Sequence, residues 1–348
     1  MVTFLSLSTN LTCSVLRTIG SPFAEPREEK CSVATNELYR YAVRNRMALL
    51  YLEALNRHKQ LGFLDEEIQK LRERYARVTD AILRVSHVLR KSGVNYAFFK
   101  TVRPYKEVTV DIDILVFRSD YYQAVKSLQR TGYVLLEGDQ FSTTFRDIGA
   151  RLNVDIYNEV HVSRLIYLDK AMLEGFVVEK RLPDNEVVDC LNQVADLLCV
   201  IAHSVLKEQM YVLSEYYTSL NYLSQMGNAD FSELLSLIEG CRLRTAVSAH
   251  LTATAFTHLF AHGSSPGKLA EILDEIGLSQ RELSQICINS FSMPYKYHIL
   301  TFVGALLEKL GEEKARRSVA HQVFNLLNPS FASSAIIKTF DHLMRETY

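Results

Sequence analysis

The sequence lacks an excess of charge, a long apolar run and closely spaced cysteine pairs. Lys and Arg number 39 against 40 Asp and Glu, a formal net charge of −1, so nothing global indicates a polyanion partner or obligate DNA binding. No stretch reaches the roughly 18 uninterrupted apolar residues of a membrane-spanning helix. The six cysteines include no CxxC pair, which argues against a disulfide framework and a zinc ribbon. We therefore expect a cytoplasmic protein without a membrane partner.

The common catalytic and phosphate-binding motifs are also missing. The chain has neither the GxSxG of hydrolases nor the GxGxxG of dinucleotide-binding folds. The run GSSPGK at 263–268 is one residue short of a Walker A loop and lacks its Ser or Thr, which indicates an interhelical turn. Any chemistry must therefore come from a different arrangement of side chains.

The hydrophobic pattern divides the chain into three parts. Residues 1–34 are mildly apolar but interrupted by Ser, Thr and Asn, so we expect a poorly ordered leader, and whether it is a genuine part of the protein stays open. Residues 35–183 combine helical spacing with short β-branched runs at 95–100, 108–117, 133–136 and 152–157, which predicts an α/β domain with N-terminal helices. Residues 184–348 predict an α-helical domain, including a long helical stretch over 187–225.

Two acids interrupt the most apolar of the predicted strands. Asp111 and Asp113 lie in VTVDIDILVF, and side chains two residues apart on a strand point to the same face. Two like charges on an apolar strand are costly unless a cation compensates for them, and Mg²⁺ prefers such oxygen ligands. A solvent-facing strand side or acids paired with arginine is the alternative.

A third acid strengthens the metal interpretation. Asp155 lies in another apolar run, LNVDIY, and three carboxylates on neighbouring strands suit a two-metal phosphoryl-transfer site. In such a site Asp111 and Asp113 hold both ions, while Asp155 completes the first ion and helps to accept a proton. We therefore expect these three residues to be catalytic and to bind Mg²⁺ or Mn²⁺.

The stretch FFKTVRPYKEVTVDIDILVF, followed by NVDIYNEV, resembles the nucleotidyltransferase superfamily that includes DNA polymerase beta, the minimal nucleotidyltransferases and uncharacterised, largely archaeal relatives. The resemblance covers residues 94–160. It implies an α+β fold in which a small mixed-sheet nucleotidyltransferase domain is preceded by helices and followed by an α-helical domain. It also implies an NTP substrate and a transfer of NMP with release of pyrophosphate.

The chain departs from that superfamily where its members have Gly followed by Gly or Ser. Lys100 and Thr101 stand there, so a hydroxyl and a cation are available to a triphosphate, but the close backbone approach that glycine allows is lost. Whether this exchange leaves the site active stays open. Arg103 and Lys106, between the two predicted strands, are further candidate phosphate contacts, with surface charge as the alternative.

Further candidates lie in the predicted helical domain. His203 and Lys207 share one face of a predicted helix, and in the superfamily a helix here packs across the catalytic cleft. The resemblance implies that both could contact phosphate, base or acceptor, and a structural buried histidine is the alternative.

The sequence therefore predicts a Mg²⁺-dependent nucleotidyltransferase and leaves its acceptor open among RNA, protein and small molecules. Two alternatives remain: a catalytically inactive nucleotide-binding or regulatory protein of the same fold, and a toxin-like transferase acting on tRNA or protein.

Overall fold

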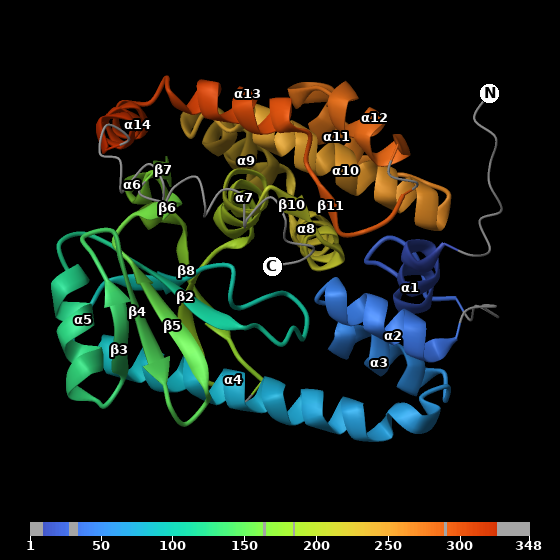
Figure 1. Ribbon diagram of the computed structural model, residues 1–348, viewed down its shortest axis with the longest axis horizontal. Helices are drawn as coiled ribbons and strands as arrows, with labels where there is room; N and C mark the ends of the chain where they lie inside the picture. Colours follow the sequence, from blue (N-terminus) through green and yellow to red (C-terminus); the bar gives the residue numbers. More distant parts are fainter. Residues whose placement is uncertain (1–9, 28–33, 163–164, 184, 289–290, 326–348) are drawn as a thin grey trace.

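The computed structural model describes residues 10–27, 34–162, 165–183, 185–288 and 291–325, and it has the α+β architecture expected from the sequence. A mixed sheet forms one part of the molecule, and helices from the second half of the chain form another (Figure 1). Within the described ranges, no helix is both long and apolar enough to cross a membrane.

The central sheet has seven strands in the order β3-β4-β5-β2-β1-β9-β8. The pairs β2·β5 and β1·β9 are parallel, and the other neighbours are antiparallel. Two-stranded sheets pair β6 with β7 and β10 with β11. The strands are β1 (Tyr96–Phe98), β2 (Asp111–Val116), β3 (Val134–Gly138), β4 (Ser142–Asp147), β5 (Leu152–Tyr157), β6 (Val160–Val162), β7 (Leu165–Leu168), β8 (Val177–Arg181), β9 (Val187–Leu191), β10 (Met210–Tyr211) and β11 (Tyr295–Lys296).

The helices fall before, within and after the segment that forms the sheet. They are α1 (Leu11–Ile19), α2 (Thr35–Arg44), α3 (Ala48–Arg57), α4 (Asp65–Lys91), α5 (Tyr121–Arg130), α6 (Lys170–Leu173), α7 (Gln193–Ala202), α8 (Leu213–Gln225), α9 (Asn228–Gly240), α10 (Arg244–His262), α11 (Gly267–Ile276), α12 (Gln280–Ile288), α13 (Ile299–Lys309) and α14 (Glu313–Asn325). Short 3₁₀ turns occur at Gly62–Leu64 and Glu174–Phe176, and a π-helical segment, η4 (His203–Glu208), follows α7.

One face of the sheet is packed against α4 and α5. Ile112, Ile114 and Val154 are fully buried in a cluster with Val85 of α4 and Leu128 of α5. Because side chains alternate along a strand, this packing directs the intervening residues of β2 and β5 to the opposite face. The apolar contacts on one face therefore determine which side of the sheet carries the acids.

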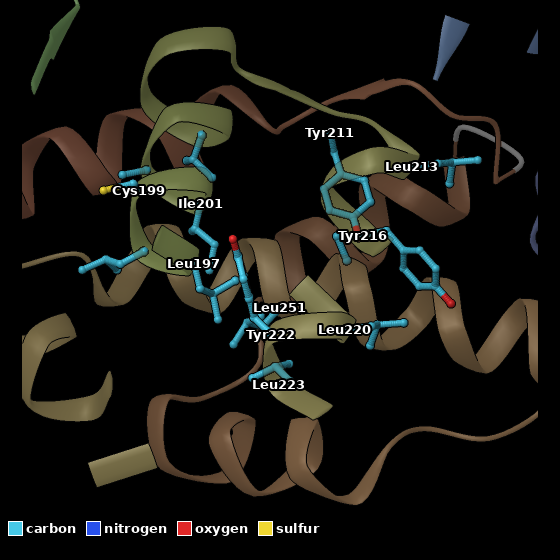
Figure 2. Close-up of a cluster of buried hydrophobic side chains, with 14 of the residues drawn as sticks. Leu197, Cys199, Ile201, Tyr211, Leu213, Tyr216, Leu220, Tyr222, Leu223 and Leu251 are labelled. Atoms are coloured by element: carbon cyan, nitrogen blue, oxygen red, sulfur yellow. The ribbon is translucent and has the colours of Figure 1, made fainter. Parts of the chain in front are cut away.

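The helical part surrounds α7, which is buried along nearly its whole length. Residues 194–202 are all buried, as expected for a helix that is apolar on every side. Figure 2 shows its Leu197 and Ile201 in a cluster with Tyr216 and Tyr222 of α8 and Leu251 of α10. A rigid core thus supports the η4 segment that continues from α7.

The predicted end of the strand-forming region near 183 is wrong. Strand β9 lies beyond it and pairs with β1 and β8, so it belongs to the central sheet. The expected helical stretch over 187–225 consists of β9, α7, η4, β10 and α8. The short run VVDCL is apolar without a clear period, and such a run does not distinguish a buried strand from a helix.

The expected poorly ordered leader contains a packed helix. Helix α1 begins after Asn10, whose side chain accepts hydrogen bonds from the backbone N–H groups of Thr12 and Cys13. Leu16 and Cys13 are fully buried, and Arg17 Nε donates to the carbonyl of Ala261 on α10 at 2.7 Å. Residues 1–9 and 28–33 lie outside the described ranges. The described part of this segment is therefore part of the core, which its interrupted apolar pattern did not indicate.

Replacing Leu16 with Ala tests the packing of α1. Because the side chain is fully buried, we expect the free energy of unfolding to fall by about 2–5 kcal/mol in urea denaturation. Val43→Ala on α2 is the control, since Val43 is 49% exposed. If both substitutions lowered the free energy of unfolding by the same small amount, the buried packing of α1 would be contradicted.

Candidate metal centre

Three carboxylates meet on the sheet face opposite α4 and α5. Asp111 and Asp113 lie on β2, and Asp155 lies on β5, the parallel neighbour in which it is directly opposite Asp113. One oxygen from each of the three carboxylates lies within 4.8 Å of the others. The structure therefore brings together the three acids that the sequence singled out.

Burial and mutual repulsion raise the pKa of two of these acids. Burial, followed by the nearby charge of Asp113, raises the pKa of Asp155 to about 6. The same two causes raise the pKa of Asp111, against the opposing effects of Lys100, Arg46 and Lys207. The protein thus gathers negative charge at a place where ionisation is costly without a cation.

The donor set fits a divalent ion. Oδ1 of Asp155 is buried and has no hydrogen-bond partner among the described residues, although buried polar atoms are normally paired. The cluster offers carboxylate oxygen ligands, which Mg²⁺ and Mn²⁺ prefer. The three acids are therefore the residues that would hold such an ion.

Lys100 lies against this cluster in an uncommon backbone conformation. Its φ of +57° is in the left-handed region that glycine usually occupies, so the chain keeps a glycine-like turn with a lysine in it. The backbone N–H of Lys100 donates to Oδ1 of Asp196 at 2.6 Å, and the hydroxyl of Tyr222 donates to the other oxygen of Asp196. These bonds fix the turn to helices α7 and α8.

The ammonium group of Lys100 is held between Asp113 and His203. Its Nζ is 3.1 Å from Oδ2 of Asp113 and 3.0 Å from Nδ1 of His203. An ammonium only donates, so Nδ1 accepts, and the neutral ring carries its proton on Nε2, which lies 3.2 Å from Oε1 of Glu208. Burial, together with Lys100 and Lys207, lowers the pKa of His203 to about 3, which agrees with a neutral ring.

Charge also determines the ionisation of Asp113. Burial alone would raise the pKa of this carboxyl, but the charges of Lys100 and Lys207 outweigh burial and hold the pKa below its usual value. Asp113 is therefore the acid of the three that already has a cationic partner within the chain.

The π-helical segment η4 brings His203, Lys207 and Glu208 to the site. It ends at Gln209, which has a left-handed φ of 50°. Wide turns of this kind change the direction of side chains and are frequent at functional sites. Lys207 opposes the raised pKa values of both Asp111 and Asp155, so its charge acts on the cluster as a whole.

Thr101 contacts the backbone of the sheet. Its hydroxyl accepts a hydrogen bond from the N–H of Asp113 at 2.8 Å and donates to the carbonyl of Phe99 at 3.2 Å. The residue is 6% exposed. These contacts hold the turn against β2, and a role for Thr101 in binding triphosphate stays a prediction.

Arg103 and Lys106 have carboxylate partners outside the three acids. Arg103 is largely buried, with Nε 3.4 Å from Oε2 of Glu107, and its Nη1 has no hydrogen-bond partner among the described residues. Lys106 is more exposed, and its Nζ lies 3.4 Å from Oε1 of Glu53. Both remain predicted phosphate contacts that would have to leave or share these partners.

Sequence reasoning missed three residues that act on the site. Arg46, between α2 and α3, opposes the raised pKa of Asp111, Glu208 contacts His203, and Asp196 holds the backbone of Lys100. Arg46 comes from a separate part of the chain, and the placement of Glu208 depends on the π turn. For Asp196 a signal existed, since it is an acid in the apolar run VADLLCVIA.

No protein-family model and no curated protein matches the chain. Among solved structures, the STING-associated CdnE c-di-GMP synthase from Capnocytophaga granulosa is matched at 12% identity and a TM-score of 0.28, over 70% of this chain and 96% of that one. A likeness of this degree carries no argument about activity, so the function must be inferred from the site itself.

The pKa of Asp155 gives a stability prediction for the metal-free protein. An acid whose pKa is higher in the folded state, about 6 against about 4 unfolded, favours folding only while it is protonated, so its ionisation penalty develops as pH rises through this interval. Asp155→Asn removes the ionisable group. We expect it to raise the free energy of unfolding by about 2 kcal/mol above pH 6, with no gain below about pH 4.

Urea denaturation in EDTA across this pH range measures the effect. Asp80→Asn, at an exposed position of α4, is the matched control and should change stability by less than about 0.5 kcal/mol at every pH. A stability change in Asp155→Asn that is the same at pH 4 and pH 7 would contradict the predicted ionisation penalty.

Proposed function

We propose that the chain is a Mg²⁺-dependent nucleotidyltransferase that moves an NMP from an NTP to an acceptor and releases pyrophosphate. The observation that carries this proposal is the convergence of Asp111, Asp113 and Asp155 from two paired strands, where a buried oxygen of Asp155 has no hydrogen-bond partner in the described part of the chain. The sequence resemblance of residues 94–160 to nucleotidyltransferases, which includes these three acids, also supports it.

The acids have distinct roles in this proposal. Asp111 and Asp113 contact the metal site from β2, and Asp155 completes it from β5. A bound Mg²⁺ or Mn²⁺ stabilises charge on the phosphoryl oxygens and lowers the pKa of the attacking hydroxyl. Asp155 also accepts the proton of the acceptor, since its environment already favours the protonated carboxyl.

The cations around the acids would bind the nucleotide. Lys207 is one of these cations, because its charge favours the ionised form of all three carboxylates. Lys100 and His203 lie beside Asp113, and their mutual contact would orient Lys100 toward a triphosphate. Thr101, Arg103 and Lys106 are further contacts in the proposal, and each would have to leave or share a partner that it already has within the chain.

The helical part would select the acceptor. Helix α7 and segment η4 come from this part and supply His203 and Lys207 to the sheet face that carries the acids. The acceptor is accordingly a group that reaches Asp155 between the sheet and these helices, in an RNA, a protein or a small molecule.

One observation favours a second function, nucleotide binding without turnover. The ion pair between Lys100 and Asp113 already compensates the charge of one of the three carboxylates. A regulatory protein that binds nucleotide without catalysis would tolerate this ion pair. Calorimetry with an NTP and Mg²⁺ distinguishes the two functions when it is combined with a pyrophosphate assay, because a regulator binds the nucleotide and releases no pyrophosphate.

Transfer of label tests the proposed activity. The protein is incubated with Mg²⁺, total RNA and cell lysate, and with each α-³²P-labelled NTP in turn, and the labelled species is isolated. Asp111→Asn and Asp113→Asn should each reduce labelling by about 100-fold or more, because a correctly held divalent ion supplies several kcal/mol of transition-state stabilisation.

Asp80→Asn is again the control, since it removes an acid that lies on the exposed side of α4. It should label at the rate of the parent protein. Unchanged labelling by both Asp111→Asn and Asp113→Asn would show that the activity does not depend on the proposed metal centre.

A further inference from the structure

The position of Lys100 is energetically costly in two ways. Its left-handed backbone, with φ at +57°, is unfavourable for a residue with a Cβ. Its side chain is only 6% exposed, so the charged ammonium group has lost most of its water. Such costs are retained where the surrounding structure requires the residue, which suggests that Lys100 does more than fill a turn.

The ammonium group is confined on several sides. Nζ lies 3.1 Å from Oδ2 of Asp113 and 3.0 Å from Nδ1 of His203. It also lies 4.8 Å from the ring centre of Phe99 and 5.8 Å from that of Tyr157. Glu208 fixes the imidazole from its other side, at 3.2 Å. The cation is therefore held on Asp113 by a buried frame and does not extend into solvent.

The position of the Lys100 ammonium group would compete with one of the two metal ions of a two-metal site. A divalent ion bound to Oδ2 of Asp113 would lie about 2.1 Å from that oxygen, where a fixed ammonium group 3.1 Å from the same atom repels it. The metal position to which Asp155 also contributes a ligand is therefore the one that remains available.

We propose that the ammonium group of Lys100 supplies the positive charge of the second metal ion, so that the site works with one divalent ion and one lysine. The inference rests on the proposed nucleotidyl transfer and specifies its cation requirement. In that reaction Asp155 takes the proton of the acceptor hydroxyl, and the acceptor oxygen forms a bond to the α-phosphorus. The bond from this phosphorus to the bridging oxygen breaks, and pyrophosphate leaves with the electron pair. Lys100 keeps its proton and neutralises the departing pyrophosphate.

Counting bound Mn²⁺ tests this assignment without an activity measurement. The protein is dialysed to equilibrium against Mn²⁺ and the α,β-methylene analogue of ATP, GTP, CTP or UTP in turn, with a matched chamber that lacks protein. We expect the chamber with protein to hold one more Mn²⁺ per chain than the matched chamber without protein. The electron paramagnetic resonance spectrum should show an isolated ion, because two Mn²⁺ ions at two-metal spacing, about 4 Å, would give a spin-coupled spectrum.

Three variants test whether Lys100 is responsible for the count. Lys100→Met should admit a second Mn²⁺ and produce the spin-coupled spectrum, since Oδ2 of Asp113 becomes available. Lys100→Arg, which keeps the charge, should hold one ion. Lys126→Met is the matched control: it removes a cation from an exposed position of α5, on the opposite side of the sheet, and it should still bind one ion.

The outcomes separate this inference from the function on which it rests. Two spin-coupled Mn²⁺ ions in the parent protein would overturn the role of Lys100 and leave the metal-dependent transfer standing. No protein-bound Mn²⁺ in the parent would overturn both. Circular dichroism would show whether Lys100→Met folds. If it does not, the number of Mn²⁺ ions bound by the parent protein still tests the role of Lys100.

Discussion

The repulsion among three carboxylates on two paired strands is the constraint on which the site depends. Asp111, Asp113 and Asp155 are placed together by the parallel register of β2 and β5, and the apolar packing of the opposite sheet face prevents them from turning away. Their charge requires compensation, and Lys100 and Lys207 provide part of it. Oδ1 of Asp155, for which residues 10–325 as far as they are described supply no hydrogen-bond partner, is where a cation would complete this compensation.

The helical part contributes to the site through a helix that is buried along nearly its whole length. Helix α7 is buried on all sides, and η4 continues from it with a wider turn that directs His203 and Lys207 toward the acids. Asp196 on α7 also holds the backbone of Lys100. The sheet thus supplies the anionic groups, and the helices position the cations that oppose them.

The grouping of the acids could be predicted from the sequence because strands impose a simple period. Two acids at i and i+2 in an apolar strand must share a face, and this local rule located Asp111 and Asp113 without any tertiary information. The surroundings depended on distant contacts. Glu208 reaches the site only through a π turn, and strand β9 is defined by its neighbours in the sheet. Neither feature has a period that sequence reading could detect.

The contact between α1 and α10 has a consequence for synthesis of the chain. Arg17 donates to the carbonyl of Ala261, 244 residues later. At about 5–20 residues per second, α1 leaves the ribosome about 10–50 s before its partner helix exists. During that interval its apolar side chains, including Leu16, have no completed core to enter, so the nascent chain is exposed to chaperones and to aggregation.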